Sequence, residues 1–278
     1  MKKIIIFTLT TILLLSAVAC TRKSAAKTAG NIELIIFAAA SMTETLEEIS
    51  GLYAEASPNV TLVFNFDSSG TLKTQIQEGA DCDLFISAGI RQVDQLDITS
   101  SPNVNTEGLD FILEASRINL LENKVALVVP EGNPKSVGSF YDLAEKLKSG
   151  SILMAMGNSD VPVGQYTQMI FEYFRLNEVA LSISGVLTYG TNVKEVTTQV
   201  VEASVDCGIV YSTDAFSAGL EIIDTATLEM CGQVIYPAAV LKTSKNSGAA
   251  QAFLDYLTGD EAITVFRKVG FSPAFTER

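Results

Sequence analysis

Histidine is absent from the 278-residue sequence, and its absence removes several kinds of site. Without an imidazole the chain cannot build a Ser-His-Asp or Cys-His nucleophile, a histidine metal site or a histidine pH switch. We therefore do not expect an enzyme.

Basic residues are also few. Lys and Arg number 19 against 32 Asp and Glu, which gives a net charge of -13 at pH 7. Nucleic acid is excluded as a partner, because its binding depends on neutralising phosphates with basic groups. If the ligand is a small anion, its attraction must come from local dipoles such as the N–H groups of helix N-termini.

Cysteine is limited to four residues, one near the N-terminus at Cys20 and three later in the chain. The odd number after Cys20 allows at most one internal disulfide. Cys82 adjoins an apolar strand and is interpreted as a small buried hydrophobe, whereas a bridge between Cys207 and Cys231 is left open. Their spacings match no metal site.

The N-terminus has the pattern of a targeting signal. Lys2 and Lys3 form a short basic region, and residues 4–15 form a mostly apolar run followed by small residues up to Ala19. The run is too short to cross a bilayer well, which favours a signal peptide over a membrane-spanning helix. We assign the signal peptide to residues 1–19.

Cys20 directly follows this signal and resembles the lipidated cysteine of bacterial lipoproteins. Such a lipobox usually has leucine three residues before the cysteine, where this sequence has Ala17, so ordinary signal cleavage remains the alternative. If Cys20 carries lipid, the protein is anchored to the cell membrane on its extracytoplasmic side. Residues 20–30 are small, polar and basic, which predicts a flexible tether.

Short strand patterns then alternate with helical patterns, which predicts an α/β fold with largely parallel sheets and helices on both faces. In such sheets ligands bind beyond the carboxyl ends of the strands, where helices begin. The expected strands are 32–37, 60–66, 84–87, 124–129, 152–156, 185–189, 208–211 and 234–241. The expected helices are 41–56, 71–77, 141–148, 164–174, 193–203 and 249–269, the last with a break at Gly259.

Four of these helices begin in small, polar or Gly- and Pro-containing turns that directly follow a strand. Proline suits the start of a helix, because the N–H group that it lacks would have no partner there. The turns are Ser41-Met42-Thr43-Glu44, Ser68-Ser69-Gly70-Thr71, Val161-Pro162-Val163-Gly164 and Gly190-Thr191-Asn192-Val193. Each turn has an ordinary structural explanation, but their shared placement predicts a site made of donors without a cation.

Two of the candidate residues have a specific alternative role. Ser41 and Glu44 match a capping box, so Ser41 is either a helix N-cap or part of a helix start that faces an anion. Tyr211 ends the expected strand 208–211, where a tyrosine is either a core residue or a ligand-binding phenol. A donor-only site at these positions would suit a fully ionised oxyanion.

In their order and spacing, these motifs resemble the molybdate-binding proteins of molybdate ABC importers, the ModA family, over about residues 32–271. Further stretches also carry the resemblance. They are Phe37-Ala38-Ala39-Ala40-Ser41, Asp83-Leu84-Phe85-Ile86-Ser87-Ala88, Gly208-Ile209-Val210-Tyr211 and Tyr236-Pro237-Ala238-Ala239-Val240.

The resemblance implies five ligand-binding positions and no catalytic residue. Ser41 would contribute its hydroxyl and backbone N–H, and Ser69 would be the second serine. The backbone N–H groups of Val163 and Val193 would be the third and fourth donors, and the Tyr211 phenol the fifth. Val163 stands where the family has alanine, which alters the pocket wall but not that donor.

The resemblance also implies a two-lobed fold like that of periplasmic binding proteins, each lobe a mostly parallel sheet flanked by helices. We place the crossings between the lobes near 124–129 and 234–241. Lobe I would then consist of 31–123 with 234–278, and lobe II of 124–233. An anion bound by both lobes would favour the closed state.

The implied ligand is molybdate or tungstate, and its metal would be held only through its oxygens, without a separate cofactor or metal site. The implied partner is the permease of an ABC importer, which would recognise the closed protein. We expect a monomer.

Asp67 departs from the expected pattern, because it stands before the serine pair where a small residue would be expected. Pointing outward, it would only add charge near a helix N-terminus. Pointing inward, it would accept a hydrogen bond, which suits a protonated oxyanion such as hydrogen phosphate and repels a fully ionised one.

Three alternatives to molybdate or tungstate are left open. The first is another oxyanion, sulfate or phosphate. The second is iron, although the residue after Tyr211 is Ser212 and not a second tyrosine. The third is a lipoprotein enzyme using Ser41, against which the missing histidine argues.

Overall fold

The computed structural model describes residues 31–275. The predicted signal peptide, the predicted lipidation at Cys20 and the predicted tether lie outside this range. Within it, no helix has the length and apolar character needed to cross a membrane.

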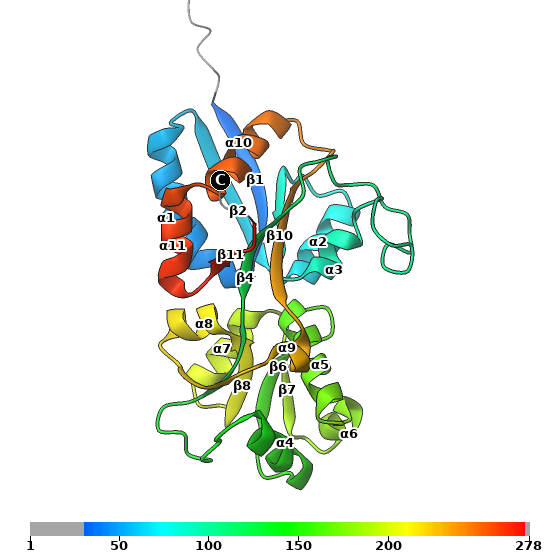
Figure 1. Ribbon diagram of the computed structural model, residues 1–278, viewed down its shortest axis with the longest axis vertical. Coiled ribbons are helices and arrows are strands. Elements are labelled where there is room, and N and C mark those ends of the chain that lie inside the picture. The colour runs from blue at the N-terminus through cyan, green and yellow to red at the C-terminus, as the bar shows by residue number, and fades with distance from the viewer. Residues whose placement is uncertain (1–30, 276–278) are drawn as a thin grey trace, which may run out of the picture. The chain divides into compact units, whose positions relative to one another are not determined.

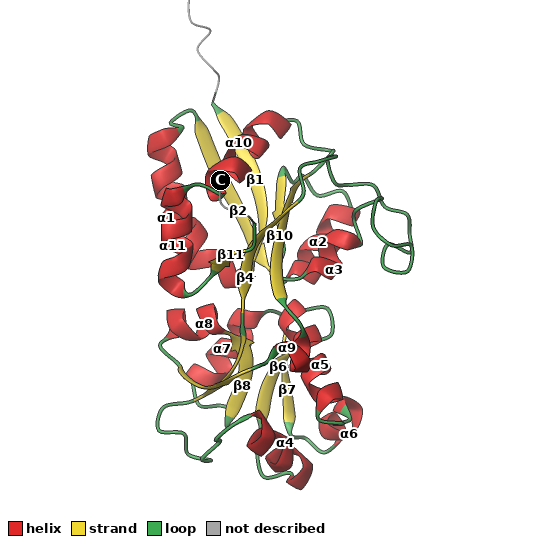
Figure 2. Cartoon of the chain, viewed as in Figure 1, coloured by secondary structure: helices red, strands yellow, loops and turns green. Residues whose placement is uncertain are grey.

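Two lobes make up this part of the chain, each built on one β-sheet with helices packed on both sides (Figure 1; Figure 2). The strand order is β11-β4-β10-β3-β1-β2 in lobe I and β7-β6-β8-β5-β9 in lobe II. This confirms the two-lobed α/β fold that the sequence predicts.

The lobe I strands are β1 (Ile32–Ala39), β2 (Val60–Asp67), β3 (Leu84–Ile86), β4 (Ile118–Asn123), β10 (Val234–Val240) and β11 (Ser272–Pro273). Its helices are the 3-10 helix η1 (Ala40–Met42), α1 (Thr43–Ala56), α2 (Ser69–Gln77), α3 (Ile90–Asp94), α10 (Ser247–Leu257) and α11 (Asp260–Val269). The lobe II strands are β5 (Val125–Val129), β6 (Met154–Gly157), β7 (Leu187–Gly190), β8 (Cys207–Tyr211) and β9 (Glu221–Thr225). The remaining helices are α4 (Phe140–Ser149), α5 (Pro162–Tyr173), α6 (Glu178–Ile183), α7 (Val193–Val201), α8 (Ser212–Ala218) and α9 (Leu228–Cys231).

Both sheets are mixed, whereas the sequence predicts mostly parallel sheets. In lobe I, β1 is parallel to β2 and β3, and in lobe II, β6 is parallel to β7 and β8. The antiparallel pairs involve the strands next to the crossings. Strand β10 is antiparallel to β3 and β4, and β5 is antiparallel to β8 and β9. Strands β5, β8 and β10 are buried along their whole length, which explains their nearly continuous apolar sequences.

The chain crosses from one sheet to the other twice. Only Lys124 separates β4 of the first sheet from β5 of the second, and α9 precedes the return into β10. The exact lobe boundaries, 31–123 with 234–278 and 124–233, remain our proposal.

Helical periodicity predicts the buried faces well. In α1, Leu46, Ile49 and Tyr53 are buried as expected, whereas Leu52 lies at the edge of the apolar face and is exposed. The expected helix 249–269 is divided near Gly259 into α10 and α11.

The three later cysteines are unpaired and buried, so the Cys207–Cys231 bridge left open by the sequence is not formed. Burial raises the pKa of the Cys82 and Cys207 thiols well above the usual range and that of Cys231 to about 11. The thiols are therefore protonated at neutral pH and behave as small apolar side chains.

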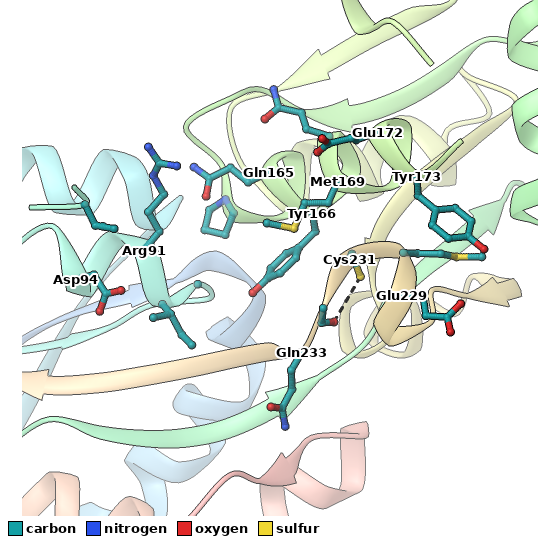
Figure 3. A pocket seen from close by; sticks show the side chains of 17 residues that line it. Arg91, Asp94, Gln165, Tyr166, Met169, Glu172, Tyr173, Glu229, Cys231 and Gln233 are labelled. Atoms are coloured by element: carbon teal, nitrogen blue, oxygen red, sulfur yellow. Dashed lines mark hydrogen bonds between the residues drawn. The ribbon is translucent and has the colours of Figure 1, made fainter. Parts of the chain in front are cut away.

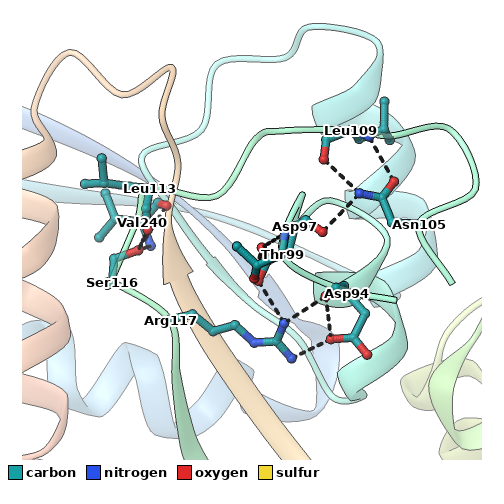
Figure 4. A network of polar contacts seen from close by, with 10 residues as sticks. Asp94, Asp97, Thr99, Asn105, Leu109, Leu113, Ser116, Arg117 and Val240 are labelled. Carbon is teal, nitrogen blue, oxygen red and sulfur yellow. Dashed lines mark hydrogen bonds and ion pairs between the residues drawn. The ribbon is translucent and has the colours of Figure 1, made fainter. Parts of the chain in front are cut away.

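Residues 95–117 leave the first sheet and are fastened to lobe I by a polar network (Figure 4). The Arg117 guanidinium contacts Asp94 at 2.5 Å and Asp97 at 3.0 Å. Burial alone would raise the pKa of Asp97, but hydrogen bonds from Thr99 and Arg117 lower it below its usual value. The stabilisation is therefore present at neutral pH and is lost as the pH falls through the lowered pKa.

Candidate functional site

The strands that lead to the predicted binding residues end level with one another. Ala39 at the end of β1 pairs with Asp67 at the end of β2, and Gly157 of β6 pairs with Gly190 of β7. The parallel strands therefore place four helix starts at two sheet edges. One of these edges belongs to lobe I and the other to lobe II. These edges face each other where the lobes meet (Figure 1).

A small pocket lies at this junction and contains four of the five predicted residues, Ser41, Ser69, Val193 and Tyr211. The fifth, Val163, has a fully buried side chain and does not line the pocket, although the preceding Pro162 does. The complete lining is Ala39, Ala40, Ser41, Asp67, Ser68, Ser69, Ala88, Val161, Pro162, Val193 and Tyr211.

Ser41 is not the helix N-cap that the capping-box pattern suggested. It lies inside η1, and the N-cap of α1 is Met42, without a side-chain cap. The Ser41 hydroxyl instead contacts the Tyr236 hydroxyl at 2.9 Å. Glu44 does not complete the box either, because its carboxylate binds Lys194. The capping box is thus not formed, and Ser41 lines the pocket.

A hydrogen-bond chain sets the direction in which Ser41 can donate. Asn123 accepts the Lys124 N–H at its Oδ1, so its amide NH₂ faces Tyr236 and donates to that hydroxyl at 3.1 Å. If the Tyr236 hydroxyl passes its own hydrogen to Ser41, the Ser41 hydroxyl hydrogen is free for a ligand. No local sequence pattern indicates a role for Tyr236 or Asn123.

The Ser69 hydroxyl can also donate to a ligand, because a different neighbour occupies its oxygen. Its Oγ accepts the backbone N–H of Ala88 at 2.9 Å, which leaves the hydroxyl hydrogen available. The cap of α2 is supplied by Ser68, whose Oγ accepts the N–H of Thr71. The adjacent serines therefore have separate tasks, one closing the helix start and the other facing the pocket.

Backbone donors come from the starts of α5 and α7. The first N–H groups of a helix have no intrahelical partner. Pro162 has no N–H, so Val163 offers the first one in α5, and Val193 is the first residue of α7. The side chain of Asn192 caps α7 by accepting the N–H of Glu195, which leaves the Val193 N–H outside that bond.

Tyr211 is almost completely buried, and its hydroxyl donates to the Ala88 carbonyl at 3.4 Å. Burial, followed by the neighbouring phenol, raises its pKa well above the usual value. Burial likewise raises the pKa of Tyr236. Both phenols therefore remain protonated and act as hydrogen-bond donors across the neutral pH range.

Among the residues that the structure describes, no lysine or arginine lines the pocket, and the one charged lining residue is Asp67. The Asp67 carboxylate accepts the N–H of Ser68 at 2.7 Å. Asp67 thus lies at the pocket edge beside the serine pair, and the direction in which its carboxylate acts on a ligand stays a prediction. The side chain brings one acceptor and one negative charge to an otherwise donor-rich site.

A larger groove also lies between the lobes, but it contains none of the five predicted residues (Figure 3). Arg91 and Asp94 line one side and Gln165, Tyr166 and Met169 the other. This wide opening offers no cluster of inward-facing hydroxyl groups. The small pocket is therefore the better candidate for a buried ion.

Within residues 31–275, no group of three or more Cys, Asp or Glu side chains could hold a metal ion. The pocket itself is lined by hydroxyl groups and helix starts, which suit the oxygens of an anion.

Changing Tyr236 to phenylalanine is expected to weaken anion binding by roughly fivefold to thirtyfold, or about 1 to 2 kcal/mol. The substitution removes the group that orients Ser41 and leaves the Asn123 amide with one partner fewer. Calorimetric titration would measure the effect. Tyr256→Phe is the matched control, because the phenol of Tyr256 in α10 donates to Glu261 in α11 and does not line the pocket. Equal losses in both variants would contradict a specific role for Tyr236.

Two α/β lobes that meet over a small buried pocket are the architecture of a solute-binding protein. The chain belongs to the family of bacterial extracellular solute-binding proteins, which it matches over residues 34–272. It is thus a solute-binding protein of an ABC transporter and not an enzyme.

Particular relatives narrow this class. The chain is 30% identical to the molybdate-binding protein ModA of Haemophilus influenzae over 252 residues, covering 88% of this chain and 91% of that protein. It is 33% identical to YvgL of Bacillus subtilis, provisionally named an ABC transporter substrate-binding lipoprotein, over 94% of this chain and 95% of that one. The periplasmic molybdate-binding protein of Azotobacter vinelandii shares the fold with a TM-score of 0.72 at 20% identity, covering 86% and 98% of the two chains. The predicted resemblance to the ModA family is confirmed.

Proposed function

We propose that this protein captures molybdate or tungstate outside the cytoplasm and delivers it to the permease of an ABC importer. Ser41, Ser69 and Tyr211 would bind the oxyanion through hydroxyl groups, and Val163 and Val193 through backbone N–H groups. The metal of the anion would be held only through its oxygens.

One observation carries this proposal, namely the polarity of the pocket. The Oγ of Ser69 is already occupied as an acceptor, and Ser41 lies at the end of a chain that begins at Asn123. The Ser69 hydrogen is thus available to a ligand, and the Ser41 hydrogen is available when the Tyr236 hydroxyl donates to Ser41. The phenol of Tyr211 is protonated and would turn its hydrogen from the Ala88 carbonyl to the ligand. A site whose donors outnumber its one charged acceptor, Asp67, favours an anion without a proton, because a protonated anion would leave its own donor unpaired at most positions.

Thermal unfolding of the purified protein with molybdate, tungstate, sulfate or phosphate tests the proposal. A ligand present at a thousand times its dissociation constant adds about 4 kcal/mol to the free energy of unfolding. We expect large shifts with molybdate and tungstate and small shifts with the other two. A shift with ferric iron alone, or with none of the anions, would contradict the proposal.

Ser69→Ala is expected to weaken molybdate binding by about 1–3 kcal/mol, because the anion loses one donor and the Ala88 N–H loses its acceptor. Titration calorimetry at pH 7 would measure the change. Ser272→Ala, which alters an exposed serine of the same lobe, should bind like the unchanged protein. An unchanged affinity for Ser69→Ala would remove Ser69 from the site.

Asp67 supports a second candidate function, capture of hydrogen phosphate. A carboxylate at the pocket edge can accept the proton that molybdate and sulfate lack near neutral pH. It also repels a fully ionised anion, so the two candidate ligands respond in opposite directions to the loss of its charge.

Asp67→Asn keeps an acceptor for the Ser68 N–H and removes the charge. We expect molybdate to bind equally or up to about fivefold more tightly, because a partly exposed like charge contributes roughly 1 kcal/mol or less. If phosphate is the ligand, the same variant should lose phosphate binding. A large loss of molybdate affinity would instead indicate that the Asp67 charge organises the site.

We further propose that residues 1–19 are removed as a signal peptide and that lipid on Cys20 holds the monomeric protein at the outer side of the cell membrane. The name of the YvgL relative supports the lipoprotein form. Labelling of the cells with a radioactive fatty acid would test it, since Cys20→Ala should abolish incorporation.

A further inference from the structure

A cluster of three charged residues joins the lobes beside the pocket. Lys194 of α7 in lobe II binds Glu44 of α1 in lobe I, with both carboxylate oxygens 2.8 Å from Nζ. The same ammonium group lies 3.4 Å from a carboxylate oxygen of Asp214 in α8. The cluster therefore exists only when the lobes are close together.

Asp214 is the unusual member. Its side chain is fully buried, and apart from the ion pair with Lys194 neither carboxylate oxygen has a well-formed hydrogen bond to another residue. A buried carboxylate without hydrogen bonds is costly to ionise, and one ammonium group at 3.4 Å is shared with Glu44. Burial raises the pKa of Asp214 to about 7, with Lys194 opposing the rise and Glu44 adding to it.

The cluster adjoins the proposed anion site along the chain and in space. Glu44 lies three residues after Ser41, Lys194 follows Val193, and Asp214 lies three residues after Tyr211. The charge of Asp214 also reaches the binding phenols. Burial is the main cause of the raised pKa values of Tyr211 and Tyr236, and Asp214 contributes to both. An anion at the phenols would therefore repel an ionised Asp214.

Other charged groups near α8 are less suited to this role. Helix α8 also packs against β5, β9 and α11. Asp224 of β9 accepts the N–H of Phe140, and Lys268 of α11 pairs with Glu48. The other charged residues of these elements are turned to solvent or bound elsewhere. Glu221 of β9 and Asp260, Glu261 and Arg267 of α11 are exposed, and Glu195 of α7 accepts the N–H of Thr191. Among residues 31–275, Lys194 and Glu44 are the charged neighbours that act on the pKa of Asp214.

We propose that capture of the anion is coupled to uptake of a proton by the carboxyl group of Asp214. This inference rests on the proposed function as an oxyanion-binding protein. In the open protein, Glu44 moves away with lobe I and water reaches the cluster, so ionised Asp214 is tolerated. Closure over a dianion excludes water and brings two further negative groups toward Asp214, and both changes favour the neutral acid.

The sign of the pH dependence follows from this difference. A group that binds its proton more tightly in the closed, anion-bound state makes binding stronger at low pH. The stabilisation is lost as the pH rises through the bound-state pKa. The dissociation constant of molybdate should therefore increase between pH 6.5 and 8.5, by up to about tenfold per pH unit for one proton. The absence of histidine leaves no ordinary side chain that titrates in this window.

Titration calorimetry of the wild-type protein with sodium molybdate tests the coupling directly. Measured near pH 7 in two buffers of different ionisation enthalpy, the binding heats give the number of protons taken up, which we expect to lie between zero and one. Asp214→Asn should bind molybdate with no proton uptake, with a constant affinity from pH 6.5 to 8.5, and more tightly than wild type at pH 8.5.

Glu202→Gln is the matched control, because it removes one exposed carboxylate at the end of α7 and should keep the wild-type pH profile. Wild-type binding without proton uptake, or an Asp214→Asn variant that keeps the wild-type pH profile, would overturn the coupling and leave the proposed function intact. A wild-type protein that binds no molybdate at any pH would overturn both. The proton count needs no variant, so it decides the question even if Asp214→Asn folds poorly.

Discussion

Gly70→Ala is expected to reduce molybdate affinity by at least about 100-fold while both lobes stay folded, because the closed state becomes sterically inaccessible. Gly70 is the second residue of α2 in lobe I, and a Cβ atom there would lie 2.1 Å from the backbone oxygen of Asp160 in lobe II. A backbone oxygen cannot rotate away as a flexible side chain could. The lobes must therefore separate, and donors from α5 and α7 no longer reach the anion together with Ser41 and Ser69.

The glycine Gly51 provides the control for this variant. It lies in α1 of the same lobe, and nothing lies within 4 Å of a Cβ atom built there. Gly51→Ala should bind normally and be slightly more stable, because alanine is the better helix former. Calorimetry would give both affinities, and small-angle scattering with excess molybdate should show a compact Gly51→Ala and an expanded Gly70→Ala. A compact Gly70→Ala with wild-type affinity would contradict the importance of this close approach.

Local sequence patterns were sufficient for the parts of the site that follow directly from strand–turn–helix units. Each of the turns at Ser41, Ser69, Val163 and Val193 comes after a strand and opens a helix, and parallel pairing then places such turns at one sheet edge. The convergence of Ser41, Ser69, Val193 and Tyr211 on one pocket could therefore be anticipated from the sequence. Their role in binding remains a prediction.

Long-range contacts could not be anticipated in the same way. Tyr236 lies 195 residues from Ser41 and Asn123 lies 113 residues from Tyr236, so no local spacing indicates that they meet. The capping-box pattern at Ser41 was misleading for the same reason, since Tyr236 engages its hydroxyl and Lys194 engages Glu44. A local pattern contains no information on such tertiary contacts, so it cannot show that a distant partner replaces the local hydrogen bond.

These distant residues also divide the work of the site. In the proposed site, the predicted residues would supply donors and Asn123 and Tyr236 would orient one of them. Glu44, Lys194 and Asp214 would respond to closure. A pocket of neutral donors needs such support, because each hydroxyl can either donate or accept and only its other neighbours decide which.

A second glycine tests a different property, the stability of lobe II. Gly164→Ala is expected to lower the free energy of unfolding by about 3 kcal/mol, at the upper end of overpacking effects. Gly164 lies in the first turn of α5, and its Cβ atom would meet the backbone oxygens of Asn158 at 2.1 Å and Gly157 at 2.4 Å. These atoms belong to the end of β6 and the turn after it, so the strain arises within one lobe and opening the cleft cannot relieve it.

Urea unfolding separates the two glycine variants. Gly164→Ala should unfold at a lower urea concentration and also bind molybdate more weakly, because the displaced turn carries the Val163 N–H away from the anion. Gly70→Ala should keep the wild-type midpoint in the absence of ligand. Gly138→Ala is the control in lobe II, since nothing lies within 4 Å of its added Cβ atom. If Gly164→Ala and Gly138→Ala have the same urea midpoint, the expected strain is absent. Helix α5 can then shift away from β6 without cost, and the close contact at Gly164 does not fix the position of the Val163 N–H.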